Sequence, residues 1–277
     1  MPTQISDKRI FQRRSQSLSA KIRTEYKQLF FYLAEANEQA NKYLDRLTVD
    51  QDLKQLLTAA LLARALTAYQ ALTLLAERGF ASEVRVTCRS LLEAKFKLGF
   101  FADDPAAPNL ILAKHEQERA KGLEKIKDGD LPVHKDLVDQ DWDKLITESR
   151  GRRKNLVGTK SKLPTIKQIA KNCWFEVDYY GPYSYFYNAT HSGVGKLEIY
   201  LAFNADGNAA ESFHYGPNDR PWIPWCTLIA TGYLRDCIEI SAISKAKSVK
   251  TAEPHSRFSG IQDGGIDITH NWLSIYH

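Results

Sequence analysis

The sequence predicts a mainly α-helical fold, a helical bundle around one antiparallel helix pair with a small β-hairpin insert. Two long apolar helical patterns, over residues 51–78 and 82–102, are separated by a link of only three residues. A link that short makes the two helices antiparallel neighbours. The first pattern is apolar on nearly every face, so we expect that helix to lie at the centre of the domain.

The bulk composition is that of a soluble globular protein. Hydrophobic residues make up 43% and charged residues 26% of the 277 residues, with a formal net charge of +5. This mild positive charge permits an acidic partner such as nucleic acid without requiring one. None of the four cysteines is in a C-x-x-C pair, and no signal peptide is visible. We therefore expect a cytoplasmic protein with reduced cysteines.

The N-terminal third is expected to be helical after a polar start. Residues 1–18 are polar, and we expect them to be disordered. A helix over 22–47 follows, because its apolar residues recur at intervals of three or four. Asp50 is the expected N-cap of the helix over 51–78, and Gly79 ends that helix as a C-cap glycine.

The middle of the chain is highly charged. Charged helical patterns extend over 106–127 and 132–148. The basic residues within 149–162 predict an exposed loop. This loop is either simply solvated or one whose Arg152 and Arg153 contact phosphate groups.

A turn signal and a long apolar pattern mark the end of the domain. Two β-rich runs flank the Asp206-Gly207 turn signal and predict a β-hairpin near 197–215. A helix over 221–245 follows it. The hairpin is expected to be an insert on the helical bundle.

The domain is expected to span 19–246, with a C-terminal tail over 247–277. Because the central helix needs apolar cover on all sides, we expect a homodimer. Arg64 and Gln70 interrupt its apolar run, so we expect a buried helix and no membrane span. The tail, with Trp272 and Tyr276, offers two alternatives. It could cover the helix within one chain, or it could bind a protein partner.

One tyrosine-rich segment is the best site candidate. Residues 183–192 combine three tyrosines with Asn188, His191 and other polar residues beside long apolar helices. Each buried polar group costs about 1–3 kcal/mol if it is unpaired. The segment therefore faces a polar cleft or belongs to a satisfied hydrogen-bond network. In the first case Tyr183, Tyr187 and Asn188 are candidate substrate-binding residues.

Three ionisable residues are the candidate catalytic group. His191 is the best acid–base candidate because an unperturbed imidazole titrates near neutrality, although a hydrogen-bonded structural histidine is the alternative. Arg89 and Glu93 are four residues apart and share one helix face with Arg85. They form either a salt bridge that joins helices or a functional cluster with His191.

The common cofactor and nucleotide motifs are absent. The sequence contains no Walker A, dinucleotide-binding, nucleophile-elbow or zinc-protease motif. No His or Cys cluster has the spacing of a zinc site. We therefore expect neither a metal nor another cofactor.

The order of these features resembles a prokaryotic family, the domain of unknown function 5677. The shared features are Gly79, the Arg89-x-x-x-Glu93 motif, the segment from Tyr183 to His191, the short β-like insert and the final long helix. The resemblance covers about residues 50–245. It implies a helical bundle and assigns no activity.

A looser resemblance is to HEPN-like helical bundles, many of which are metal-independent ribonucleases of defence and toxin systems. It implies an RNA-targeting effector in which His191 acts on the 2′-hydroxyl and Arg89 stabilises the phosphate. The HEPN signature, an Arg followed by four to six residues and then His, fits no histidine in this chain. The alternative is a non-catalytic helical interaction or regulatory protein whose polar cluster is structural.

Overall fold

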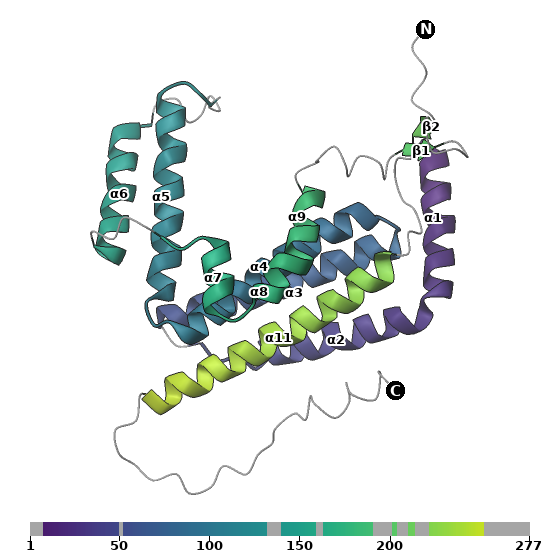
Figure 1. The fold of residues 1–277 in the computed structure, drawn as a ribbon, viewed down its shortest axis with the longest axis horizontal. Coiled ribbons are helices and arrows are strands. Elements are labelled where there is room, and N and C mark those ends of the chain that lie inside the picture. The colour runs from purple at the N-terminus through teal and green to yellow at the C-terminus, as the bar shows by residue number, and fades with distance from the viewer. Residues whose placement is uncertain are drawn as a thin grey trace, which may run out of the picture.

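The structure is a computed structural model and is mainly α-helical (Figure 1). It describes residues 8–49, 52–131, 140–158, 163–190, 201–203, 210–213 and 222–251. The elements in chain order are α1 (Lys8–Glu25), α2 (Lys27–Asp45), α3 (Leu53–Glu77), α4 (Ala81–Asp103), α5 (Ala107–Lys127), α6 (Trp142–Val157), α7 (Ile166–Asn172), α8 (Glu176–Asp178), the π-helix η2 (Tyr179–Tyr183), α9 (Ser184–Thr190), β1 (Leu201–Phe203), β2 (Ala210–Phe213) and α11 (Trp222–Thr251).

The predicted antiparallel pair, α3 and α4, lies at the centre of the bundle. α11 packs along both helices, and α2 packs against α3 and α11 (Figure 1). Leu62 and Tyr69 of α3 and Leu91 and Phe96 of α4 are fully buried in the shared core. Burial of each such side chain contributes about 1.5–3 kcal/mol, so this core sets the position of every other element.

The turn between α3 and α4 confirms the predicted glycine cap. Gly79 has φ 79°, a left-handed conformation that glycine adopts without a side-chain clash. The Phe80 amide donates to the Leu75 carbonyl, and the Gly79 amide donates to the Ala76 carbonyl. These are the two hydrogen bonds of a Schellman motif.

The N-terminal region differs from the prediction. The segment 1–18 is not disordered throughout, because α1 begins at Lys8. The single helix predicted over 22–47 is instead the end of α1 and then α2, with a break at Tyr26. The segment is polar, but it is rich in Arg, Lys and Gln, which are good helix formers. A polar composition therefore did not exclude a helix here. The N-cap of α3 is also not Asp50: the Asp52 carboxylate accepts from the Gln55 amide.

The predicted basic loop over 149–162 is helical as far as Val157. α5 and α6 pack as a helical hairpin that stands beside the bundle (Figure 1). The carboxylates of α5 neutralise the basic residues, as Arg150 pairs with Glu124 at 2.7 Å and Arg152 with Glu116 at 3.1 Å. This pairing explains why a run of basic residues forms a helix here rather than an open loop.

A series of short elements covers part of α4. α7 begins with a capping box between Thr165 and Gln168. α8, η2 and α9 follow it, and η2 contains Pro182, which lacks the amide needed for a regular helix. α7 and α9 both pack against α4. The tyrosine-rich segment is thus held against the core.

The strands and the tail are described only in part. β1 and β2 pair antiparallel with an irregularity between Ala202 and Phe203. The connection and the flanking residues of the hairpin predicted near 197–215 lie outside the described residues, so the insert is not established. α11 extends to Thr251, and residues 252–277 of the predicted tail also lie outside the described part.

α3 retains an apolar outer surface. It is the one helix in the described part of the chain whose length and composition would allow it to cross a membrane. Its contacts with α2, α4 and α11 are also those of a core helix. Leu56 and Leu74 are exposed, and they lie about five turns apart on the same side of α3.

Candidate functional site

Charged side chains recur at every fourth position of α4. Arg85, Arg89, Glu93 and Lys97 follow this interval in a helix whose other residues are largely buried. Residues four apart lie on neighbouring turns of one helix face, so these side chains form a ridge that drifts slowly round the helix. α9 packs against α4 and brings tyrosines to this ridge.

Arg89, Glu93 and Tyr183 form one hydrogen-bonded group, which we term the Arg89 cluster. Nε of Arg89 donates to Oε1 of Glu93 at 3.1 Å, and its Nη2 donates to the Tyr183 hydroxyl at 3.2 Å. That hydroxyl donates to Oε1 of Glu93 at 3.0 Å. Burial and the Glu93 carboxylate raise the pKa of Tyr183 to about 12, so the phenol is protonated at neutral pH.

Tyr187 completes the surroundings of Arg89. The Arg89 guanidinium lies 4.7 Å from the centre of the Tyr187 ring and 5.1 Å from that of Tyr183. Both distances are within the range of cation–π attraction. Tyr187 is 45% exposed, so part of its side chain reaches the solvent beside the Arg89 guanidinium.

Arg85, one turn earlier, is the more unusual arginine. It is only 4% exposed, and its Nη1 donates a 3.4 Å hydrogen bond to the Tyr185 hydroxyl. Its guanidinium lies 5.6 Å from the Tyr185 ring centre and 5.8 Å from that of Trp222. Its Nε has no hydrogen-bond partner, and no carboxylate pairs with Arg85 among the described residues. A buried cation without a counter-charge is costly.

The contacts of these arginines with the neighbouring rings form adjacent groups on α4, which we together call the arginine–aromatic face. It consists of Arg85, Arg89, Tyr185, Tyr187 and Trp222, from α4, α9 and the start of α11. Trp222 is 44% exposed, so the face carries open aromatic surface at both ends. Sequence reasoning identified Arg89 and Tyr187 but missed Trp222, which lies in the final helix pattern.

Two of the other predicted site residues are not tested, because His191 and the side chain of Asn188 lie outside the described residues. Arg152 and Arg153 belong to α6 on the separate α5–α6 hairpin. Arg152 is paired there with Glu116 and Glu148.

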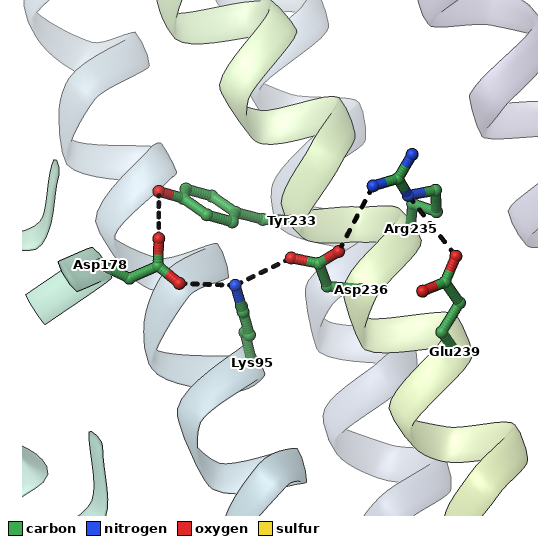
Figure 2. Close-up of polar contacts among 6 residues, drawn as sticks. All are labelled: Lys95, Asp178, Tyr233, Arg235, Asp236 and Glu239. Carbon is green, nitrogen blue, oxygen red and sulfur yellow. Dashed lines mark hydrogen bonds and ion pairs between the residues drawn. The ribbon is translucent and has the colours of Figure 1, made fainter. Parts of the chain in front are cut away.

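A second polar group, which we term the Lys95 cluster, was not predicted (Figure 2). Nζ of Lys95 lies 2.6 Å from the Asp178 carboxylate and 2.8 Å from that of Asp236. The Tyr233 hydroxyl donates to Asp178 at 3.3 Å. The cluster joins α4, α8 and α11, with Lys95 buried and the two carboxylates partly exposed.

The charges of the Lys95 cluster compensate one another. Burial alone would lower the pKa of Lys95, but its hydrogen bonds and ion pairs with Asp178 and Asp236 outweigh burial and raise that pKa. Lys95 therefore stays charged. A lysine within the buried stripe of an apolar helix requires carboxylate partners. The position of Lys95 in that stripe was therefore the sequence signal that could have predicted this cluster.

The two clusters are linked through aromatic rings. Lys95 lies 4.7 Å from the ring centre of Phe175, which stacks on Phe96. Phe96 in turn contacts Tyr183 of the Arg89 cluster. Asp178 directly precedes η2, which ends at Tyr183. The Lys95 cluster therefore fixes the start of the segment that carries the tyrosines.

The described residues contain no group of three or more His, Cys, Asp or Glu side chains able to hold a metal ion. The side chains of the arginine–aromatic face supply guanidinium, phenol and indole groups. Guanidinium groups bind phosphate, and exposed rings stack on planar groups.

Comparison with known proteins identifies a family for this chain. A family model described as "Family of unknown function (DUF5677)" matches residues 55–209, which include α4, α9 and the Arg89 cluster. No curated protein and no solved structure matches the chain.

Proposed function

The chain belongs to the DUF5677 family, which has no assigned activity; for this chain we propose that it is an RNA-targeting protein. Single-stranded RNA would bind on the arginine–aromatic face. In this proposal the protein acts in the cytoplasm as an HEPN-like effector of prokaryotic defence or toxin type.

The observation that carries the proposal is the state of Arg85. It is a buried cation with no carboxylate partner among the described residues, although Arg89 one turn later has Glu93. An anionic ligand would supply the missing counter-charge. Arginine suits a phosphate because its planar donors match the phosphate oxygens.

The rings around the arginines favour RNA over a small anion. Tyr187 and Trp222 each expose nearly half of their surface beside a guanidinium. Unpaired bases stack on such rings, and each stacked base contributes about 1–3 kcal/mol. Alternating rings and arginines thus fit a strand that presents both bases and phosphates.

Cleavage is a further part of the proposal and depends on His191. This residue directly follows Thr190, the last residue of α9, and is four positions from Tyr187 in the sequence. An imidazole there would accept the proton of the 2′-hydroxyl as its oxygen attacks the adjacent phosphorus. The P–O5′ bond would break to leave a 2′,3′-cyclic phosphate, the leaving 5′-oxygen would take a proton from water, and an arginine of the face would stabilise the charge on the phosphate. The reaction would need no metal.

One observation favours the alternative, a non-catalytic interaction or regulatory protein. Arg89, Glu93 and Tyr183 satisfy one another, as a structural cluster that fixes the register of two helices would. The missing HEPN signature points the same way. In this alternative the partner is a protein, and the tail over 247–277 is its candidate binding segment.

RNA binding and cleavage by purified protein test these functions. Trp222→Ala should weaken binding to a poly-uridine oligonucleotide by about 5- to 150-fold, the loss expected when one base is no longer stacked. Trp174→Ala is the matched control, because this tryptophan is 90% exposed and lies outside the face. His191→Ala should bind RNA like the wild type and lose its cleavage.

The outcomes separate the proposals. If neither wild type nor His191→Ala cleaves total RNA but both bind it, the protein binds RNA without cutting it. If the wild type does not bind RNA, or if Trp174→Ala weakens binding as much as Trp222→Ala, the RNA function on this face is wrong. The interaction protein is then the better description.

A further inference from the structure

Trp225 lies one turn after Trp222 and adjoins the arginine–aromatic face. Residues three apart lie on the same side of a helix, so both indoles project from one side of α11. The centre of the Tyr185 ring lies 6.2 Å from that of Trp222 and 5.7 Å from that of Trp225. Tyr185, which also accepts the hydrogen bond from Arg85, therefore contacts both indoles.

Part of each indole reaches the solvent. Trp222 is 44% and Trp225 is 43% exposed. Trp225 also contacts Phe186, a fully buried ring, at 6.1 Å between ring centres. Its contacts with two rings restrict the indole before any ligand binds, so a planar ligand that stacks on it loses little affinity to ordering of the side chain.

The two indoles are not parallel. The plane of the Tyr185 ring makes an angle of 42° with the plane of Trp222 and of 86° with the plane of Trp225. Because these two angles differ by about half a right angle, the planes of the two indoles are inclined to each other by at least that difference. Two bases that stack on these rings would therefore not be parallel to each other.

We propose that Trp225 stacks on a second base, next to the base on Trp222, so that the two tryptophans recognise two adjacent nucleotides that are unpaired and turned apart. This inference rests on the proposed function and adds to it the conformation of the bound strand. The bases of a single strand can be splayed out onto aromatic side chains. A duplex holds its neighbouring bases parallel and paired, so it does not fit this pair of rings.

The test uses short RNA strands in which most nucleotides lack a base. One probe carries a single uridine, and a second probe carries two adjacent uridines. The second uridine should strengthen binding to the wild type by about 5- to 150-fold, the gain expected for one more stacked base. Trp225→Ala should lose this gain and bind both probes alike, with nearly the affinity of the wild type for the single-uridine probe.

Leu228→Ala is the matched control, because this leucine lies one turn further along α11 and is 47% exposed. It should keep the full gain. Trp225→Phe retains an aromatic ring and should keep most of it. A duplex of poly-uridine with poly-adenine should bind the wild type and Trp225→Ala equally, because its bases stay paired and only its phosphates are contacted.

The outcomes distinguish this inference from the proposed function. If the second uridine gives the wild type no gain, or if Trp225→Ala keeps the gain, the second base position is wrong while RNA binding stands. The same holds if Trp225→Ala weakens binding of the duplex and of the single-uridine probe as much as that of the two-uridine probe, because Trp225 then acts only on the fold. If the wild type binds no RNA at all, the proposed function fails and this inference fails with it.

Discussion

The Tyr183 hydroxyl lies 3.2 Å from Nη2 of Arg89, although 94 residues separate them in the sequence. The contact joins η2 to α4 and closes a three-membered network with Glu93. Each of the three side chains is partly buried and forms hydrogen bonds with the other two, so none of them is left unpaired. The network therefore fixes how α9 lies on α4, and with it the position of Tyr187 over Arg89.

We predict that Tyr183→Phe removes part of the alkaline destabilisation of the protein. The pKa of Tyr183 is raised from 10.0 to about 12, mainly by burial. Above pH 10 the unfolded chain loses this proton before the folded chain does, so stability falls as pH rises from 10 to 12. Denaturation by urea at several pH values should show a shallower fall for the variant. An identical pH dependence would contradict the assignment.

Lys95→Met should destabilise the fold by about 3 kcal/mol. The substitution leaves Asp178 and Asp236 without their shared cation in a partly buried place. Lys42→Met is the matched control, because Lys42 pairs with Glu38 on an exposed helix surface, where ion pairs contribute little to stability. Chemical denaturation measures both. Equal, small effects would mean that the Lys95 cluster does not stabilise the bundle.

Gly99→Ala and Gly122→Ala should act in opposite directions. A Cβ atom at Gly99 would lie 2.5 Å from the ring of Phe175, the ring that contacts Lys95. We expect a loss of about 1–3 kcal/mol from this overpacking. A Cβ at Gly122 meets no atom within 4 Å, so alanine there should stabilise α5 by about 0.5–1 kcal/mol. Thermal unfolding of both variants tests the pair, and a stable Gly99→Ala protein would refute the close contact.

The central helices could be predicted because several local signals agreed. The apolar patterns of α3 and α4, the short link and Gly79 all indicated the same antiparallel pair. The Arg89 cluster was also within reach, since ionisable residues in apolar segments need partners. The matched range of the family model, residues 55–209, covers these features.

The remaining features depended on contacts between distant segments. Arg150 and Arg152 are helical because carboxylates of α5 pair with them. Those carboxylates lie outside residues 149–162, so the sequence of this segment alone could not predict the helix. In the sequence, nothing distinguishes Asp178 and Asp236 from surface aspartates. Their role is visible only in the structure, where both pair with Lys95 of α4. His191 and the side chain of Asn188 lie outside the described residues, so their predicted roles stay predictions.

We predict that the protein is a dimer and that Leu74→Glu makes it monomeric. Leu56 and Leu74 are exposed on one side of α3, which remains apolar although it is central to the bundle. A second copy would cover this side, and a glutamate there would be buried without a partner. Light scattering should give twice the 31.5 kDa mass of one chain for the wild type.

Leu228→Glu is the control for the dimer, because this leucine is similarly exposed but belongs to α11. It should remain dimeric. A wild-type mass near 31.5 kDa at micromolar concentration would reject the dimer. Loss of the dimer in both leucine variants would reject α3 as the interface.

Trp174→Gly should stabilise the protein by about 1 kcal/mol, although it removes a large aromatic side chain. Trp174 has φ 63° in the position where a Schellman motif ends α7. Its amide donates to Lys171, and the Phe175 amide donates to Ala170. This position normally holds glycine, because a side chain in the left-handed conformation costs about 1–2 kcal/mol. The indole is 90% exposed, so removing it loses almost no apolar burial.

Val177→Gly is the control for this change. Val177 is also highly exposed but lies in α8, where the backbone is helical and glycine should destabilise by about 0.5–1 kcal/mol. The two glycine variants should therefore shift the unfolding midpoint in urea in opposite directions. If Trp174→Gly lowers the midpoint as Val177→Gly does, the left-handed conformation at residue 174 does not cost the stability that we assign to it.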